Sequence, residues 1–180
     1  MKGIVFTEFL EFSEQRFGAA AVDRVIMAAD LPHGGAYTAV GTYDHRELVT
    51  ILGRLSHEIS TPAPVLLQEF GTYLFGVLAL AYPALIQPSK DAFALLASIE
   101  GVIHFEVCKL YPDAQLPRFT YEQFGPDRMI LNYNSERSFA DLAEGLLRGC
   151  FAHFGERVRI EREDLSGGAG TQVRFTLSRE

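Results

Sequence analysis

Apolar residues follow a helical period through the first two thirds of the chain. Side chains that recur every three or four positions predict a helix with one buried face. Five segments show this spacing: Gly3 to about Phe17, about Ala19 to Ala29, about Asp44 to Ile59, Ser60 to about Tyr82, and Ser89 to about Tyr111. Asp44 and Ser89 are residue types that cap helix starts. The Pro/Gly cluster at Leu31–Gly35 predicts a loop between the second and third helices.

Alternation of apolar and polar residues replaces this period after Tyr111. Four short strands are expected, at Arg118 to Phe124, Met129 to Tyr133, about Val158 to Glu163, and Gln172 to Leu177. A helix from Phe139 to Phe154 lies between the two pairs of strands. The Gly-Pro-Asp-Arg sequence at 125–128 and the glycine-rich stretch at 166–170 predict the two hairpin turns. Helices followed by a small antiparallel sheet make an α+β domain.

Length and composition indicate one domain with two parts. The chain has 180 residues, 48% of them hydrophobic, which is enough for a sizeable core. We expect a helical subdomain over residues 1–60 and a larger subdomain with the sheet over residues 61–180. The net charge of −7 argues against nucleic acid or an anionic membrane as a partner.

Two apolar stretches are candidates for a targeting signal or a membrane span. Glu8, Glu11 and Glu14 interrupt the N-terminal apolar run, which argues against a signal peptide. The most apolar stretch, Leu74–Ile86, is too short to span a membrane and contains Pro83. We therefore expect a soluble, cytoplasmic protein that does not associate with a membrane.

Motifs typical of enzymes are missing from the sequence. There is no Gly-x-Ser-x-Gly nucleophile elbow. The glycine-rich stretch at 166–170 lacks the lysine and the following helix of a phosphate-binding loop. Cys108 and Cys150 do not have the spacing of a disulfide framework or a zinc site. Four of the five histidines form no ligand pair at helical spacing: His33, His45, His57 and His153.

A polar cluster follows the second predicted strand. In an extended chain, Tyr133, Ser135 and Arg137 share one face, because side chains at i, i+2 and i+4 point the same way. A phenol, a hydroxyl and a guanidinium then converge, and all three donate hydrogen bonds. Arginine in particular matches a carboxylate bidentately. Asn134 and Glu136 would face solvent. The face suits an anion with several oxygens, although an edge strand with polar residues outward has the same pattern.

His104 is the second candidate, about thirty residues upstream of the polar cluster. It lies in an apolar run on the helix predicted from Ser89 to about Tyr111. Neutral imidazole is a standard axial ligand of haem iron. A lone histidine on an apolar helix face is also compatible with a core residue whose ring nitrogens are satisfied by the protein. Gly101, in the middle of the same helix, costs about 1 kcal/mol relative to alanine, which a close approach by a flat, rigid group would explain.

These features resemble one known family, the haem nitric-oxide/oxygen binding (H-NOX) domains. The resemblance runs nearly end to end and rests on Met1–Phe6, His104, Leu116-Pro117-Arg118, and Tyr133-x-Ser135-x-Arg137. It implies one haem b (iron protoporphyrin IX) per chain. By resemblance, His104 ligates the iron, the Tyr-x-Ser-x-Arg residues hold the haem propionates, and Pro117 presses on the porphyrin and bends it. The cysteine-rich zinc site of some members has no counterpart here.

The resemblance also implies which residues face the gas. In members that bind dioxygen, a distal tyrosine lies nine residues beyond the first tyrosine of the Tyr-x-Ser-x-Arg motif. Here that position is Leu142. The positions that line the distal face by resemblance are all apolar: Val5, Phe9, Leu74, Phe75, Leu78, Leu142 and Leu146. A bound dioxygen acquires negative charge and needs a donor, whereas nitric oxide does not, so this face favours nitric oxide. Tyr73 or Tyr82 would change this if either reached the face.

The function expected from the resemblance is that of a haem-based nitric oxide sensor, which also binds carbon monoxide. Nitric oxide would weaken or break the bond between iron and His104, and the two subdomains would shift. A partner that prefers one arrangement would detect the change. By resemblance that partner is a histidine kinase or a cyclic-di-GMP enzyme. Three alternatives remain open: a dioxygen-binding sensor, a haem enzyme such as a peroxidase, and a haem-free binding module.

Overall fold

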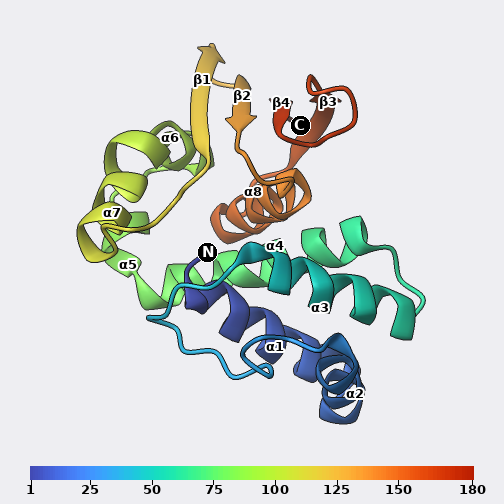
Figure 1. The fold of residues 1–180 in the computed structure, drawn as a ribbon. Coiled ribbons are helices and arrows are strands. Elements are labelled where there is room, and N and C mark those ends of the chain that lie inside the picture. Colours follow the sequence, from blue (N-terminus) through green and yellow to red (C-terminus); the bar gives the residue numbers. More distant parts are fainter. The chain divides into compact units, whose positions relative to one another are not determined.

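Helices form the first part of the chain and an antiparallel sheet forms near its end, which confirms the α+β class (Figure 1). The computed structural model describes all residues from 1 to 180. Contacts divide the chain into two units, Met1–Phe70 and Gly71–Glu180. The division falls inside helix α4 (Ala63–Ala81), which runs through it without a break.

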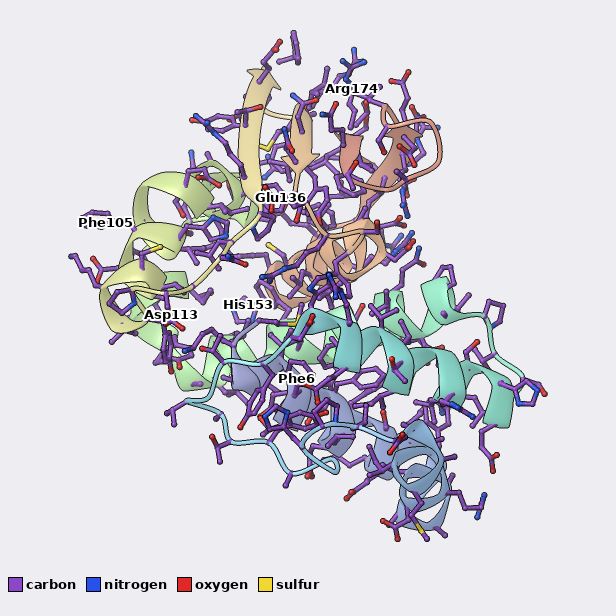
Figure 2. The ribbon with its side chains drawn as sticks, viewed as in Figure 1. Phe6, Phe105, Asp113, Glu136, His153 and Arg174 are labelled. Atoms are coloured by element: carbon purple, nitrogen blue, oxygen red, sulfur yellow. The ribbon has the colours of Figure 1, made fainter.

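The first unit is helical. It contains α1 (Gly3–Phe17), α2 (Ala19–Ala29), α3 (His45–Glu58) and the first turns of α4. The Asp44 carboxylate caps α3 by accepting a hydrogen bond from the Arg46 N–H at 2.9 Å, as expected. Phenylalanine rings fill the core: the ring of Phe9 meets that of Phe70 edge to face at 5.1 Å between centroids. Figure 2 labels Phe6, which is fully buried in the same unit.

The second unit contains a four-stranded antiparallel sheet. Its strands are β1 (Arg118–Phe124), β2 (Arg128–Asn134), β3 (Val158–Asp164) and β4 (Gln172–Arg179), in the order β1-β2-β4-β3. Alternate residues of the two central strands are buried, which is the period of a sheet with one covered face. The covered face belongs to a core that it shares with helices α6 (Ala92–Ala97) and α8 (Ala140–Phe154). The sheet contributes six buried residues to this core: Met129, Leu131, Tyr133, Val173, Phe175 and Leu177.

Within this unit, α4 and α8 pack with their backbones in close contact. A Cβ at Gly149 would lie 2.6 Å from the Phe75 Cβ and 2.9 Å from the Thr72 carbonyl oxygen. A Cβ at Gly71 would lie 2.5 Å from the Leu142 carbonyl oxygen. The Thr72 hydroxyl also donates to the Gly145 carbonyl at 3.2 Å. Glycine is therefore required for this close helix crossing.

The segment that carries His104 differs from the prediction of one long helix. Its start is capped by Asp91, whose carboxylate accepts from the Ala94 N–H at 2.7 Å, and not by Ser89. Ser89 instead closes a turn after the short helix α5 (Pro83–Ile86), through its N–H and the Ile86 carbonyl. A carboxylate is the stronger cap because it carries charge at the positive end of the helix.

Three helical pieces follow this cap. Helix α6 is succeeded by a π-helix, η1 (Ile99–His104), and then by α7 (Phe105–Leu110). The N–H of Ile103 reaches the carbonyl of Ser98 at 3.3 Å, five residues back, which is the π-type bond. Gly101 lies in this wider turn, and apart from its own helix backbone and chain neighbours no atom is within 4 Å of the position its Cβ would occupy. Such π-turns are often found at functional sites.

Smaller differences concern element ends. Strands β2 and β4 extend one or two residues beyond their predicted limits, and α8 begins at Ala140.

Helix α4 is long and apolar enough to cross a membrane by length and composition. One such helix is weak evidence, because core helices of soluble proteins meet the same criterion.

The helix crossing predicts a large effect of one methyl group. Gly149→Ala is expected to lower the free energy of unfolding by about 1–3 kcal/mol, because the Cβ overlaps Phe75 and the α4 backbone. The matched control is Gly53→Ala in α3, where no atom lies within 4 Å of the added Cβ. That substitution should raise stability by about 0.5–1 kcal/mol. Denaturant titration followed by circular dichroism measures both, and equal effects would contradict the close packing.

Candidate functional site

The predicted polar cluster lies where β2 ends, and its geometry is that of a turn. β2 stops at Asn134, so Ser135 and Arg137 do not continue the extended face that the sequence suggested. The Tyr133 hydroxyl donates to the Arg137 carbonyl at 3.0 Å, and the Arg137 N–H donates to Ser135 Oγ at 3.1 Å. The turn therefore brings the three residues together through local hydrogen bonds. Burial raises the pKa of Tyr133, which keeps its phenol protonated as a donor.

Arg137 is the charged member of this turn. Its guanidinium donates to Gln115, to both the backbone carbonyl and the side-chain oxygen. A guanidinium has five N–H donors, so donors remain for an anion. Asn134 and Glu136 are exposed, as expected, and Glu136 is labelled in Figure 2. The donor set fits carboxylates such as the propionates of the expected haem.

His104 lies at the end of η1, with 16% of its side chain exposed. Its Nδ1 is 3.0 Å from Glu100 Oε1. Burial lowers the pKa of His104, while the nearby Glu100 carboxylate acts in the opposite direction with a smaller effect. The ring is therefore neutral at pH 7, which is the form that binds metal. With the hydrogen on Nδ1 shared with Glu100, the lone pair is on Nε2.

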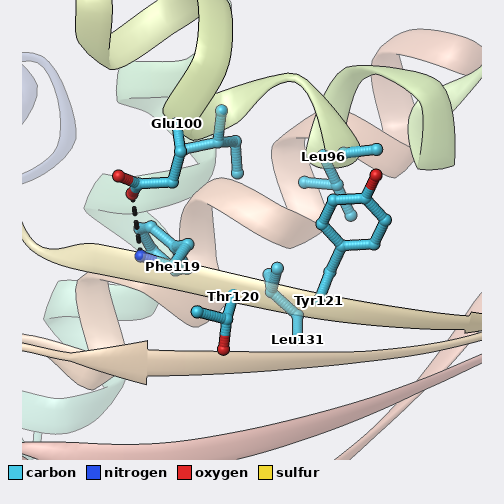
Figure 3. Close-up of a pocket in the computed structure, with 8 residues that line it drawn as sticks. Leu96, Glu100, Phe119, Thr120, Tyr121 and Leu131 are labelled. Carbon is cyan, nitrogen blue, oxygen red and sulfur yellow. Dashed lines mark hydrogen bonds between the residues drawn. The ribbon is translucent and has the colours of Figure 1, made fainter.

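Phe119 connects His104 with the polar turn. Its ring centroid is 5.9 Å from that of His104 and 5.6 Å from that of Tyr133. Its backbone N–H donates to Glu100 Oε1 at 2.8 Å, the bond drawn in Figure 3. The structure thus brings His104 and Tyr133, one from each sequence candidate, close to the same aromatic ring.

Pro117 precedes this ring by two residues. It is half-buried and lies immediately before β1, in the segment that joins α7 to the sheet. Pro117 is therefore two residues from Phe119, the ring that lies close to both candidates.

The candidate distal residues of the second unit lie on the two helices that cross at the glycines. Leu74, Phe75 and Leu78 follow Gly71 on one face of α4, at spacings of three, four and seven. Leu142 and Leu146 lie on α8 on either side of Gly145. Leu142 is 8% exposed and Leu74 4%, while the other three are half-buried. Both faces are apolar.

The other two candidates, Val5 and Phe9, belong to α1 in the first unit. Phe9 is fully buried in that unit's aromatic core, and Val5 is half-buried.

Tyr73 and Tyr82, the two candidate hydrogen-bond donors to a bound gas, have different surroundings. Tyr82 forms a hydrogen bond with Tyr111, which raises its pKa. That bond occupies the Tyr82 hydroxyl. Tyr73 is half-buried and adjoins Leu74 along the helix, so its side chain points about 100° away from that of Leu74.

The donor chemistry fits a cofactor with one protein ligand. No group of three or more His, Cys, Asp or Glu side chains is arranged to hold a metal ion. Cys108 is exposed, and Cys150 is buried with its pKa raised to about 12 by desolvation. A single neutral imidazole suits haem, because the porphyrin supplies the remaining equatorial ligands.

Sequence reasoning did not identify three residues of this site: Glu100, Gln115 and Phe119. Glu100 carried a signal, since it lies four residues before His104 and such pairs meet on a helix. Gln115 and Phe119 carried none, because their contacts join segments that only the fold brings together.

Comparison with known proteins gives a consistent result. The family model for haem-NO-binding proteins matches residues 2–162. The H-NOX protein from K. algicida, in its unliganded Fe(II) crystal structure, is 37% identical with a TM-score of 0.95. That similarity covers 100% of this chain and 97% of the other. A comparison with curated proteins found no match.

Two Shewanella structures are also similar. One is the H-NOX from Shewanella woodyi, solved in solution in the Fe(II)CO state with IWP-051 bound. It is 40% identical with a TM-score of 0.85, and the similarity covers 100% of this chain and 95% of the S. woodyi chain. The H-NOX protein from S. oneidensis in the Fe(II)NO state is 25% identical with a TM-score of 0.92, covering 100% and 99%. This chain therefore belongs to the haem-NO-binding (H-NOX) family of haem-based gas-sensor domains.

Proposed function

We propose that this chain is a nitric oxide sensor that binds haem b through His104 and regulates a signalling partner. The observation that carries the proposal is the environment of His104: a half-buried, neutral imidazole with Nδ1 held by Glu100 and Nε2 available. Haem, when bound, would supply an iron that binds diatomic gases, and His104 is the residue that would hold it. His104 would then act as the switch, because nitric oxide binding would weaken or break its bond to the iron.

The propionates are assigned to the turn after β2. Arg137 provides the charge, and the Ser135 hydroxyl can donate while it accepts the Arg137 N–H. The Tyr133 hydroxyl is already bonded to the Arg137 carbonyl, so Tyr133 first of all shapes the turn. Pro117 is proposed to press on the porphyrin from the segment before β1.

Selectivity for nitric oxide is assigned to the leucine-rich faces of α4 and α8. A dry apolar face gives no hydrogen bond to the partial negative charge that dioxygen acquires, and loses about 1–3 kcal/mol of possible stabilisation. Nitric oxide and carbon monoxide depend much less on such a donor. The alternative function is that of a dioxygen sensor, which requires a hydroxyl near Leu142 to donate a hydrogen bond to the bound dioxygen. A peroxidase would need an acid-base group on the same face.

The readout is proposed to be a change in the arrangement around η1, which carries His104. A partner responds only by the difference in its affinity for the two arrangements. The acidic chain, with net charge −7, suits a basic surface on a cytoplasmic histidine kinase or cyclic-di-GMP enzyme.

The first test removes the iron ligand. His104→Gly is expected to purify with little or no haem and to recover a Soret absorption band when imidazole is added, because free imidazole fills the space and ligates the iron. His57→Ala, an exposed histidine in the last turn of α3, is the control and should bind haem normally. Wild-type protein without a Soret band after reconstitution would refute the proposal.

The second test compares members of the propionate turn. Arg137→Ala should speed haem transfer to apomyoglobin more than Ser135→Ala, because charged hydrogen bonds contribute about 1.5–3 kcal/mol and a neutral one about 1 kcal/mol. The control is Arg128→Ala, at the far end of β2, which lies over the Phe124 ring. If all three variants transfer haem at the wild-type rate, the propionates are bound elsewhere.

The third test introduces a donor on the distal face. Leu142→Tyr is expected to raise dioxygen affinity by about five- to a hundredfold, the effect of one hydrogen bond of about 1–3 kcal/mol. Leu142→Phe adds the same ring without the hydroxyl and should leave dioxygen affinity unchanged. Absorption spectra in air and under nitric oxide measure both. Stable dioxygen binding by the wild type would favour the dioxygen sensor instead.

A further inference from the structure

Glu100 contacts both His104 and the start of β1, and the family resemblance assigns it no role. One of its oxygens, Oε1, is 3.0 Å from His104 Nδ1 and accepts the Phe119 N–H at 2.8 Å. Figure 3 shows Glu100 reaching from its helix to the start of β1. A single oxygen atom therefore joins the imidazole to the strand that follows Pro117.

The surroundings fix this carboxylate in place. Glu100 lines a pocket of about 250 Å³ between α6–η1 and the β1–β2 hairpin, together with Leu96, Phe119 and Leu131. Its side chain is 44% exposed, whereas that of His104 is 16% exposed. The hydrogen bond from the Phe119 N–H limits rotation of the Glu100 carboxylate. Glu100 Oε1 is therefore kept facing His104 Nδ1 by a second contact besides the histidine itself.

The π-turn contributes to this arrangement. Glu100 and His104 both lie in η1, where the Ile103 N–H bonds five residues back. Side chains four apart are neighbours on a helix, so the pair is within reach. The other acidic residue near the ligand, Glu106, pairs instead with Lys109 at 2.7 Å on α7. Glu100 is thus the acidic group that serves His104.

We propose that Glu100 is a positioning residue for the iron ligand: it keeps the hydrogen of His104 on Nδ1, orients Nε2 and increases its donor strength. The inference rests on the proposed function, since it concerns the bond assigned to His104. A carboxylate that accepts the second N–H of a ligating histidine raises its basicity, and losing such a partner typically costs about 10- to 100-fold in metal affinity. Glu100 then sets how readily nitric oxide releases His104.

The same oxygen links that release to the sheet. When His104 leaves its gas-free position, the bond from Glu100 to the Phe119 N–H is the direct connection through which β1 and the preceding Pro117 respond. Glu100 therefore acts both on the strength of the ligand bond and on its transmission.

The experiment is resonance Raman spectroscopy of the haem-loaded, ferrous, gas-free full chain. The iron–histidine stretching frequency should fall in Glu100→Gln, whose neutral carbonyl is a weaker acceptor, and fall further in Glu100→Ala. Under nitric oxide, the fraction of five-coordinate haem should rise in the same order. Glu106→Gln is the matched control and should behave as wild type in both measurements.

The outcomes separate this inference from the proposed function. A wild-type protein with no iron–histidine band would refute the proposed function itself. A normal wild-type band that stays unshifted in Glu100→Gln would overturn only the role of Glu100. If Glu100→Ala folds poorly, the Gln variant still decides, because it keeps an acceptor for Phe119.

Amide hydrogen exchange tests the link to the strand. The Phe119 N–H should exchange faster in Glu100→Ala than in wild type, while the neighbouring β1 amides bonded to β2 keep their protection. In wild type, nitric oxide should also speed exchange at Phe119. If the Phe119 N–H exchanges at the same rate with and without nitric oxide, Glu100 does not transmit the breaking of the iron–His104 bond to β1. That result would overturn the proposed link to the sheet and leave only the effect of Glu100 on the strength of the iron–His104 bond.

Discussion

Backbone contact between α4 and α8 is the constraint on which the candidate distal face depends. At Gly71 and Gly149 each helix approaches the other so closely that a methyl group would overlap carbonyl or Cβ atoms. That approach fixes the rotation of both helices, and with it the direction in which Leu74 and Leu142 face. Helix α4 also runs through the division between the two units.

The surroundings of His104 are organised around hydrogen bonds and aromatic contacts. Glu100, His104 and Phe119 form a chain of contacts from η1 into β1, and Tyr133 continues it to the turn that holds Arg137. This contrast suits the proposed roles. A metal ligand needs a basic nitrogen held at a defined orientation, whereas a gas of low polarity needs a dry space without competing donors.

The family and fold follow from the match over residues 2–162 and the structural similarity. Ligation by His104, the propionate turn, the role of Pro117 and selectivity for nitric oxide are proposals supported by burial, hydrogen bonds and apolar lining. The signalling partner is proposed from the family resemblance and the net charge of −7.

The sequence by itself determined the elements and the chemical identities at the site. Helical periodicity placed α1, α2 and α3 within one residue at each end, because burial of one face imposes that period. Tertiary structure decided what periodicity does not record. The Asp91 cap and the π-turn depend on competition between neighbouring hydrogen bonds, and a period of 3.6 cannot distinguish a π-turn from an α-helix. Gln115 and Phe119 reach the site only through chain reversal, since contacts between distant segments leave no local pattern.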